Sequence, residues 1–342
     1  MRKAIILFNL GGPDKLESVE PFLFNLFNDP AILNLPVIFR YPLAKLISNR
    51  RAPIAKKIYN ELGGSSPILK LTEDQSVALE KKLNQNKLNE KYKCFVVMRC
   101  WHPRADEVIK NVRLYNPNEI ILMPLYPQYS AATSGSSIKE WNEVCKKNNY
   151  KIKTSTICCY PTDENFINAH VKEISKKIKN INNFKLIFSA HGLPKKNIKK
   201  GDPYQWQVEQ SVNKIVKNLN CNNLDWVLSY QSRVGPLKWI GPSTDDVIVE
   251  NSKIGKHIVL VPIAFVSEHS ETLVELDIEY KKLATDNGCN EYTRVPALGT
   301  NEDFIQAMSE LIINKDAYKI SENYYPPKIQ CPSNFKKCHC LN

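Results

Sequence analysis

The chain has 342 residues, of which 43% are hydrophobic, and its formal net charge is +12. This length is too great for one small core, and this hydrophobic fraction excludes disorder over the whole chain. The positive charge comes mainly from scattered lysines, with no basic block interleaved with aromatic residues and no zinc-finger spacing, so no nucleic-acid binding is expected.

The N-terminal segment carries basic residues and then an apolar run, as a signal peptide does. The run ends after about seven residues at Gly11-Gly12-Pro13, without a small-residue cleavage site, which favours a first strand entering a glycine turn. No segment approaches the ~18 uninterrupted apolar residues of a membrane span. The sequence therefore predicts a cytoplasmic protein, whose lysines could still favour approach to an anionic membrane surface.

Short apolar, β-branched runs alternate with longer segments of helical period, and four runs lie on each side of about residue 160. The runs cover residues 3–10, 93–100, 119–127, 153–159, 184–191, 224–232, 257–265 and 291–298. Continuously apolar runs are typical of strands buried on both faces of a parallel sheet. Helical period is found at 72–88, 138–148, 165–179, 204–219 and 271–287.

This alternation predicts an α/β protein with two similar Rossmann-like domains, each with a mostly parallel four-stranded sheet flanked by helices. We place the domains at 1–160 and 161–316, followed by a cysteine-bearing tail at 317–342. Ligands of such sheets bind beyond the carboxyl ends of the strands, so both halves are expected to face one cleft.

His191 ends one predicted strand, between the small residues Ala190 and Gly192, which leave its ring accessible. A histidine at a strand end can bind a metal or accept a proton near neutral pH. Taken alone, such a histidine is more often a structural residue.

Three glutamates, Glu271, Glu275 and Glu279, stand at i, i+4 and i+8, which places them on one face of an α-helix. A solvated acidic face is one explanation. An acidic path for cations or protons is the other, because the segment opens just after a predicted buried strand whose end should meet the cleft.

Arg51, Tyr59 and Ser66 offer donors suited to a ligand carboxylate. The residues alone favour a simpler explanation, a capped turn before the helix predicted at Thr72. The aromatic-rich stretch at 21–42, with prolines at 30, 36 and 42, fits either the core or a lip over an apolar ligand that touches a membrane surface.

The polar C-terminal end carries Cys331, Cys338 and Cys340. Thiolate clusters of this kind hold zinc or an iron–sulfur centre. A four-thiolate site lacks one ligand, which Cys158 or Cys159 could supply from the end of a strand, and Cys158 is favoured. His339 is a zinc-type alternative.

The chain resembles the ferrochelatases over nearly its whole length. The motifs that carry the resemblance are Phe-Asn-Leu-Gly-Gly-Pro at 8–13, Arg-Arg-Ala-Pro at 50–53, Gly-Gly-Ser-Ser-Pro-Ile at 63–68, Tyr-Pro-Gln-Tyr-Ser at 126–130, Phe-Ser-Ala-His-Gly-Leu-Pro at 188–194, Gly-Asp-Pro-Tyr at 201–204, Tyr-Gln-Ser-Arg-Val-Gly-Pro at 230–236 and the segment 261–280. The resemblance implies a chelatase fold that holds a porphyrin between two domains.

The resemblance also implies roles for particular residues. It assigns His191 and Glu271 to metal insertion, as the residues that would bind the Fe²⁺ substrate, and Glu275 and Glu279 to an acidic path. Three further residues fall at porphyrin-contacting positions, namely Arg51, Tyr59 and Ser66.

Some members of this family carry a [2Fe-2S] cluster, and the tail resembles theirs. In the animal-type branch the fourth cysteine lies where this chain has Ala131, whereas a bacterial branch takes its ligand from near Cys158. The implied ligands are Cys158, Cys331, Cys338 and Cys340.

The expected function is therefore the insertion of Fe²⁺ into protoporphyrin IX to form protohaem, the last step of haem biosynthesis. We expect peripheral contact with the inner face of a membrane and leave a homodimer open. The alternatives are a chelatase for coproporphyrin or another metal, and a non-catalytic iron–sulfur carrier or sensor. A dehydrogenase is disfavoured, because Gly11-Gly12-Pro13 lacks the Gly-x-Gly-x-x-Gly spacing.

Overall fold

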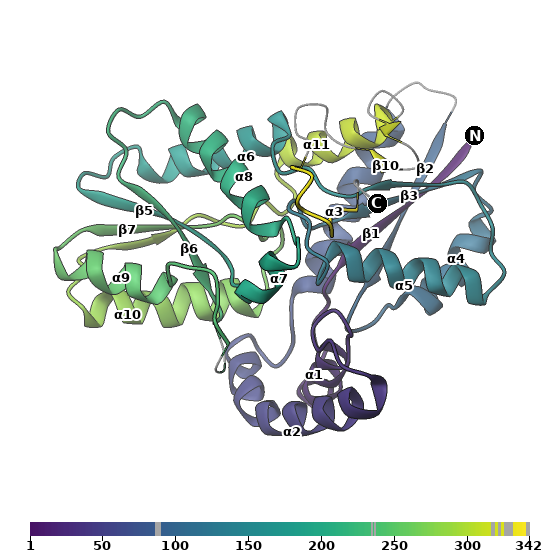
Figure 1. The fold of residues 1–342 in the computed structure, drawn as a ribbon. Helices are drawn as coiled ribbons and strands as arrows, with labels where there is room; N and C mark the ends of the chain where they lie inside the picture. The colour runs from purple at the N-terminus through teal and green to yellow at the C-terminus, as the bar shows by residue number, and fades with distance from the viewer. Residues whose placement is uncertain are drawn as a thin grey trace. The chain divides into compact units, whose positions relative to one another are not determined.

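The computed structural model describes residues 1–85, 90–233, 235, 237–315, 319–320, 323–324 and 331–339. The chain forms two compact units (Figure 1). The first comprises Met1–Cys159 and Met308–Tyr325, and the second comprises Tyr160–Ala307 and Pro326–Asn342.

The first unit is built on a sheet with the strand order β2-β1-β3-β4-β10-β9. Its strands are β1 (Arg2–Asn9), β2 (Lys91–Met98), β3 (Glu119–Pro124), β4 (Thr154–Ile157), β9 (Lys319–Ile320) and β10 (Asn323–Tyr324). Strands β1 to β4 and β10 are parallel, and β9 is antiparallel to β10. The predicted four-stranded parallel sheet is thus confirmed and extended by two short strands.

Helices of the first unit surround this sheet and extend beyond it. They are α1 (Val19–Phe27), α2 (Val37–Glu61), α3 (Ile68–Gln85), α4 (Ala105–Tyr115) and α5 (Ser134–Lys147), with a 3₁₀ turn η1 at Leu16–Ser18. The end of the helix predicted to reach Leu88 lies outside the described residues. Arg51 and Tyr59, for which the residues alone favoured a capped turn, lie within α2, whereas Ser66 lies in the turn before α3.

Helix α2 contains Pro42 and Pro53 and nevertheless continues for 25 residues. A proline inside a helix removes one backbone hydrogen bond and costs about 3 kcal/mol. Tertiary packing offsets this cost, because Ala52 and Tyr59 of α2 lie buried against Val19 and Phe22 of α1. The general expectation that proline interrupts a helix is therefore not met in α2.

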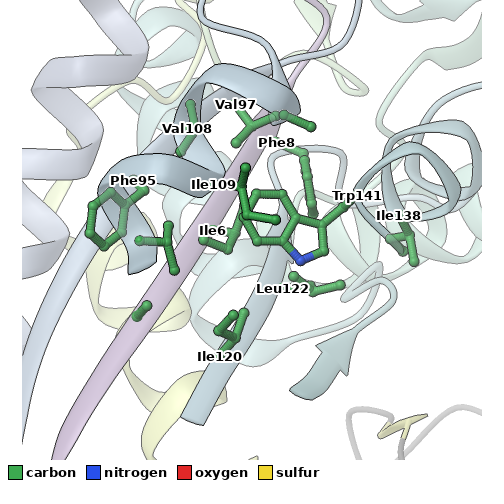
Figure 2. Packing of buried hydrophobic residues seen from close by; sticks show 13 residues of the cluster. Ile6, Phe8, Phe95, Val97, Val108, Ile109, Ile120, Leu122, Ile138 and Trp141 are labelled. Carbon is green, nitrogen blue, oxygen red and sulfur yellow. The ribbon is translucent and has the colours of Figure 1, made fainter. Parts of the chain in front are cut away.

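Packing in the first unit centres on Trp141 of α5, which is fully buried (Figure 2). Its ring meets Phe8 of β1 edge-on, with the ring centroids 6.3 Å apart. Residues from α4 and β3, including Ile109 and Leu122, close the cluster around it. Truncating a buried aromatic residue of this kind costs about 3–5 kcal/mol.

The C-terminal part of the chain returns to the first unit, where the described residues include a strand pair and an ion pair. Strand β10 pairs with β4, and the buried Nζ of Lys315 lies 2.9 Å from Oε1 of the buried Glu119. Residues 308–325 consequently belong with the first half of the chain, where the predicted domain boundaries had not placed them.

The second unit has a four-stranded parallel sheet with the order β6-β5-β7-β8. Its strands are β5 (Phe184–His191), β6 (Trp226–Gln231), β7 (His257–Pro262) and β8 (Tyr292–Arg294). Its helices are α6 (Glu164–Ile178), α7 (Lys195–Lys199), α8 (Tyr204–Leu219), α9 (Thr244–Lys253), the π-helix η2 (Glu271–Glu279) and α10 (Tyr280–Asp286), and α11 (Glu302–Ile313) begins in this unit. Helices α9 and α10 cover one face of the sheet, and α6 and α8 lie on the other (Figure 1).

The predicted fold class is confirmed, since each of the eight predicted strands is found within a few residues of its expected place. One helix differs in kind. The segment predicted as an α-helix over 271–287 is a π-helix up to Glu279, in which the amide of Tyr280 donates to the carbonyl of Glu275. None of the described helices is long and apolar enough to cross a bilayer.

Candidate active site

His191 is the last residue of β5, and its side chain is 41% exposed. Its Nδ1 lies 2.6 Å from the carbonyl oxygen of Gly192. A carbonyl oxygen can only accept, so Nδ1 carries the proton and the neutral ring keeps its lone pair on Nε2. That Nε2 atom lies 3.7 Å from Oε1 of Glu271. The accessible nitrogen thus faces a carboxylate.

Gly192 allows the ends of β5 and β6 to come together. Its amide donates to the carbonyl of Gln231 at 2.8 Å. A Cβ at this position would lie 2.8 Å from the same oxygen and 3.2 Å from the ring of Trp239. The small residue after His191 is therefore needed for backbone approach as well as for access to the ring.

Glu271 begins the π-helix, and its carboxylate lies between two histidines. Its second oxygen, Oε2, is 4.0 Å from Nε2 of His269. This oxygen is buried, and no hydrogen bond to it is found within the described parts of the chain. A buried carboxylate oxygen without a donor is costly unless a cation or proton satisfies it. The arrangement suits a group that exchanges protons or meets a metal ion.

Glu275 lies one helical turn further and is held by four hydrogen bonds. It accepts from the amide of Ser232 at 3.0 Å and its hydroxyl at 2.6 Å and from Nε2 of Gln231 at 3.2 Å, and its Oε1 shares a hydrogen bond of 3.1 Å with the hydroxyl of Tyr280. Burial, and then the charge of Glu271, raise the pKa of Glu275 to about 7. This carboxyl can therefore gain or lose a proton near neutral pH.

Two residues of strand β8 bind the π-helix. The guanidinium of Arg294 binds Asp277, and its Nη1 also binds Glu268 just before the helix at 2.7 Å. The hydroxyl of Tyr292 donates to the carbonyl of Leu276 at 2.6 Å. π-Helices are rare and often lie at functional sites, and outside contacts of this kind stabilise them.

The structure brings together some of the predicted site residues and leaves others apart. His191, Glu271 and Glu275 form one cluster, whereas Glu279 is exposed at the end of the π-helix. The cluster also contains His269 and Ser232, which lie in the motifs at 261–280 and 230–236 and for which no role was predicted. Among the described residues, no group of three or more His, Cys, Asp or Glu side chains has the geometry of a metal site.

The predicted porphyrin-binding residues lie in the first unit. Arg51 is exposed on α2, with its guanidinium 5.8 Å from the centre of the Phe27 ring, and Tyr59 is buried on the same helix. Ser66 lies in the turn before α3, where its amide donates to the carbonyl of Pro13 at 2.8 Å. Their contact with a porphyrin remains a prediction.

The predicted cluster cysteines fall in both units. Cys158 follows β4 in the first unit and is buried. Cys331 and Cys338 are buried in the second unit, where Nε2 of Gln207 donates to Sγ of Cys331 at 3.3 Å. Cys340 lies outside the described residues.

The tail is docked on the second unit by backbone and ring contacts. The amide of Lys337 donates to the carbonyl of Gly201 at 3.1 Å, and the ring of Phe335 lies 5.9 Å from that of Trp206. A Cβ at Gly201 would lie 2.7 Å from the amide nitrogen of Lys336. The glycine before α8 thus makes room for the tail.

Solved structures support the fold. The chain is similar to SirB from Bacillus subtilis with Fe³⁺, with a TM-score of 0.55 at 12% identity over 93% of this chain and 98% of that one. It is also similar to CbiX, described as the terminal enzyme for biosynthesis of sirohaem in denitrifying bacteria, with a TM-score of 0.50 at 11% identity over 93% of this chain and 100% of that one. Both likenesses concern the fold alone.

Sequence relatives are much closer. The chain is 82% identical to a ferrochelatase of Pelagibacter ubique (strain HTCC1062), over 100% of this chain and 99% of that protein. It is 50% identical to a ferrochelatase of Rickettsia felis (strain ATCC VR-1525 / URRWXCal2), over 99% and 98%. A model of the ferrochelatase family matches residues 2–316. The prediction of a ferrochelatase, which is a lyase, is thereby confirmed, and the chain belongs to the ferrochelatase family.

Proposed function

We propose that this chain inserts Fe²⁺ into protoporphyrin IX and so forms protohaem, the last step of haem biosynthesis. The observation that carries the proposal is the contact of Nε2 of His191 with Glu271, 3.7 Å apart at the carboxyl end of β5. The reaction removes two pyrrole protons while the metal enters, so it needs a basic nitrogen and a nearby carboxylate. This pair supplies both.

In this proposal Nε2 of His191 accepts a pyrrole proton or meets the entering iron. The carboxylate of Glu271 stabilises the positive charge that either event brings to the ring. Glu275 is the next acceptor, because its pKa of about 7 lets it take and pass on a proton at neutral pH. Glu279 would continue the acidic path towards solvent. Arg51, Tyr59 and Ser66 would hold the porphyrin, and strain in the bound macrocycle would expose its nitrogens.

The test is haem formation by the purified protein from ferrous iron and protoporphyrin without oxygen. Replacement His191→Ala should lower kcat by at least about 100-fold, as loss of a general base does. His102→Ala, which removes an exposed histidine paired with Glu107, is the matched control. Normal rates in His191→Ala would contradict the assignment. Rates with coproporphyrin in place of protoporphyrin, and with zinc or cobalt in place of iron, distinguish the proposed reaction from those of related chelatases.

We further propose a [2Fe-2S] cluster held by Cys158, Cys331, Cys338 and Cys340. The described residues fit such a group, because the three described cysteines are buried and one accepts an N–H bond from Gln207, as thiolate ligands of clusters do. The cluster would supply a redox-active or structural centre, and we assign it no step of metal insertion.

The cluster proposal is tested by absorbance and electron paramagnetic resonance of protein purified without oxygen. Cys331→Ser and Cys338→Ser should lose the cluster spectrum, whereas Cys221→Ser, at an exposed position, should keep it. Bound zinc without iron would favour the zinc-type alternative with His339. A cluster spectrum without metal insertion by the wild type would favour the carrier or sensor.

The start of α2 supports peripheral contact with the inner face of a membrane. Val37, Ile38, Phe39 and Tyr41 are between 56% and 70% exposed. Arg40 lies in the same turn but is half-buried, with its Nη1 donating to the carbonyl of Leu35 at 2.7 Å. The support therefore comes from the exposed apolar side chains, as in helices that lie on bilayers. We therefore place the protein in the cytoplasm, partly at the membrane surface.

Cosedimentation with vesicles tests this contact. Phe39→Ser should reduce binding to vesicles that contain anionic lipid, and Leu114→Ser, which changes an exposed leucine of α4, should not. If neither variant differs from the wild type, the contact is elsewhere or absent. Sedimentation of the free protein decides whether it forms a homodimer.

A further inference from the structure

The hydroxyl of Tyr280 lies between two carboxyl groups from different elements. It is 3.1 Å from Oε1 of Glu275 in the π-helix and 3.3 Å from Oδ2 of Asp245 in the first turn of α9. The residue Tyr280 is buried, whereas Asp245 is exposed to solvent. A chain of oxygen atoms therefore runs from beside Glu271 to the surface of the second unit.

The number of protons limits the hydrogen bonds that these oxygen atoms can form with one another. A tyrosine hydroxyl has one proton and can donate to only one carboxylate. Both contacts are hydrogen bonds only if one carboxyl carries a proton and donates it to the tyrosine oxygen. Glu275 is suited to be that acid, because burial and the charge of Glu271 raise its pKa to about 7. Among the described residues, Oε1 of Glu275 accepts one other bond, from the amide of Ser232, which leaves it able to carry the proton.

We propose that Tyr280 and Asp245 form a proton relay from Glu275 to solvent, which carries away the protons released by the porphyrin. The relay rests on the proposed function. Protonated Glu275 gives its proton to the oxygen of Tyr280 while Tyr280 gives its own to Oδ2 of Asp245. Asp245 releases the proton to water, and the tyrosine hydroxyl turns back, so no charge accumulates and no other reactant is needed.

Two features favour this route. Burial, then the charges of Glu275 and Asp245, raise the pKa of Tyr280 far above its usual value, so Tyr280 passes a proton without becoming an anion. Ser243 also donates to Oδ2 of Asp245 at 3.2 Å, which keeps this carboxylate turned towards the tyrosine. The relay leaves the helix at Glu275 and so adds a second route beside the acidic path that would continue to the exposed Glu279.

The π-helical geometry explains why Tyr280 and Glu275 meet. In an α-helix the backbone bonds join residues four apart, whereas here the amide of Tyr280 bonds to Glu275, five residues before it. The side chains of this i, i+5 pair consequently point the same way. If the segment is taken as an α-helix, the spacing of the residues places Glu275 on one face with Glu279 and does not include Tyr280.

The experiment is a single turnover without oxygen, in which protein loaded with protoporphyrin is mixed with ferrous iron in weak buffer. Porphyrin absorbance reports metal insertion, and a soluble pH indicator reports proton release. The variants are Tyr280→Phe, Asp245→Asn, Asp245→Glu and Glu279→Gln. Asp246→Asn is the matched control, because it removes an exposed carboxylate one residue from Asp245.

Tyr280→Phe and Asp245→Asn should slow both signals several-fold, with KM for porphyrin unchanged. Asp245→Glu should restore the rate, as should formate or imidazole buffer added to Asp245→Asn. The same buffers should not restore Tyr280→Phe, whose missing hydroxyl is buried. Glu279→Gln should lower the rate of metal insertion less than Tyr280→Phe does. A merely structural role would lower the melting temperature and would show no rescue by small acids.

Wild-type rates of insertion and proton release in Tyr280→Phe and Asp245→Asn would overturn the relay. The relay would also be overturned if neither Asp245→Glu nor added buffer restored the rate of metal insertion. A larger loss of rate in Glu279→Gln than in Tyr280→Phe and Asp245→Asn would overturn it as well. If the wild type itself inserts no iron, the proposed function fails first and the relay falls with it. If the wild type forms haem and the variants insert iron at the same rate, the proposed function is supported and the relay alone is contradicted.

Discussion

Arg294, the last residue of β8, holds Asp277 of the π-helix through two parallel hydrogen bonds, with Nε 2.6 Å from Oδ1 and Nη2 2.7 Å from Oδ2. The same guanidinium reaches Glu268, which precedes the helix. One side chain therefore connects two points that flank Glu271 and Glu275. Arg294 thus holds in place the segment that carries Glu271 and Glu275.

Replacement Arg294→Lys should test this positioning. Lysine keeps the charge but cannot make the paired contact with Asp277 and also reach Glu268. We expect the free energy of unfolding to fall by about 1–3 kcal/mol, because a buried charged network loses hydrogen bonds, and kcat to fall with it. Lys282→Ala, which breaks an exposed pair with Asp286, is the control. Equal unfolding curves and equal kcat in the two variants would show that the contact is dispensable.

Glu275 should make stability depend on pH in the neutral range. Its pKa in the folded protein, about 7, lies above the usual 4.5, so folding favours the protonated form. The stabilisation from this group is fully present below pH 4.5 and is lost as pH rises through 7, by about 1–3 kcal/mol. Glu275→Gln should therefore gain stability relative to the wild type between pH 5 and pH 8.

Denaturant unfolding at several pH values measures this difference. Glu250→Gln, at an exposed position of α9, provides the comparison and should track the wild type. A constant difference between Glu275→Gln and the wild type over this range would mean that Glu275 is ionised in the folded protein throughout.

His170 should make the protein sensitive to acid. It is buried in α6 with its ring 4.9 Å from that of Phe166, and neither of its nitrogens has a hydrogen bond within the described residues. Burial lowers its pKa from 6.5 to about 3, so the unfolded chain binds a proton that the folded one does not. Stability should then be lost as pH falls below 6.5, by about 2 kcal/mol at pH 5.

His170→Leu should remove this part of the acid sensitivity, because leucine cannot bind a proton. His102→Leu, at an exposed histidine, should leave it in place. Thermal melts between pH 4 and pH 7 distinguish the two. An unchanged slope in His170→Leu would show that the acid response arises at other groups.

Gly201→Ala should loosen the cysteine-bearing tail. The new Cβ would lie 2.7 Å from the amide nitrogen of Lys336, and the backbone of Gly201 has a φ of +87° that alanine adopts poorly. Cys331 and Cys338 should then react faster with a maleimide, as read by mass spectrometry of their peptides. Gly255→Ala is the matched control, since its φ of +69° is similarly strained but no atom lies within 4 Å. Equal rates in both variants would show that the tail is held by other contacts.

Much of the fold could be predicted from the chain alone. The runs 257–265 and 184–191 are mostly apolar, and such runs are buried on both faces of parallel strands, so β7 and β5 followed from the sequence. His191 could be placed at a strand end for the same reason. The helix at Val37–Glu61 could not be predicted from the sequence, because it contains two prolines. Its packing against α1 explains why it forms despite them.

The motifs determined the family and marked His191, Glu271 and Glu275, because these residues lie in segments of distinctive sequence. Tertiary structure decided how they act. A change from α- to π-helical bonding joins Tyr280 to Glu275. Gln231 and Ser232, at the end of β6, bind that carboxyl, and Tyr292 of β8 binds the backbone of the same helix. Such effects depend on burial and on neighbours distant in sequence, so residue spacing could not predict them.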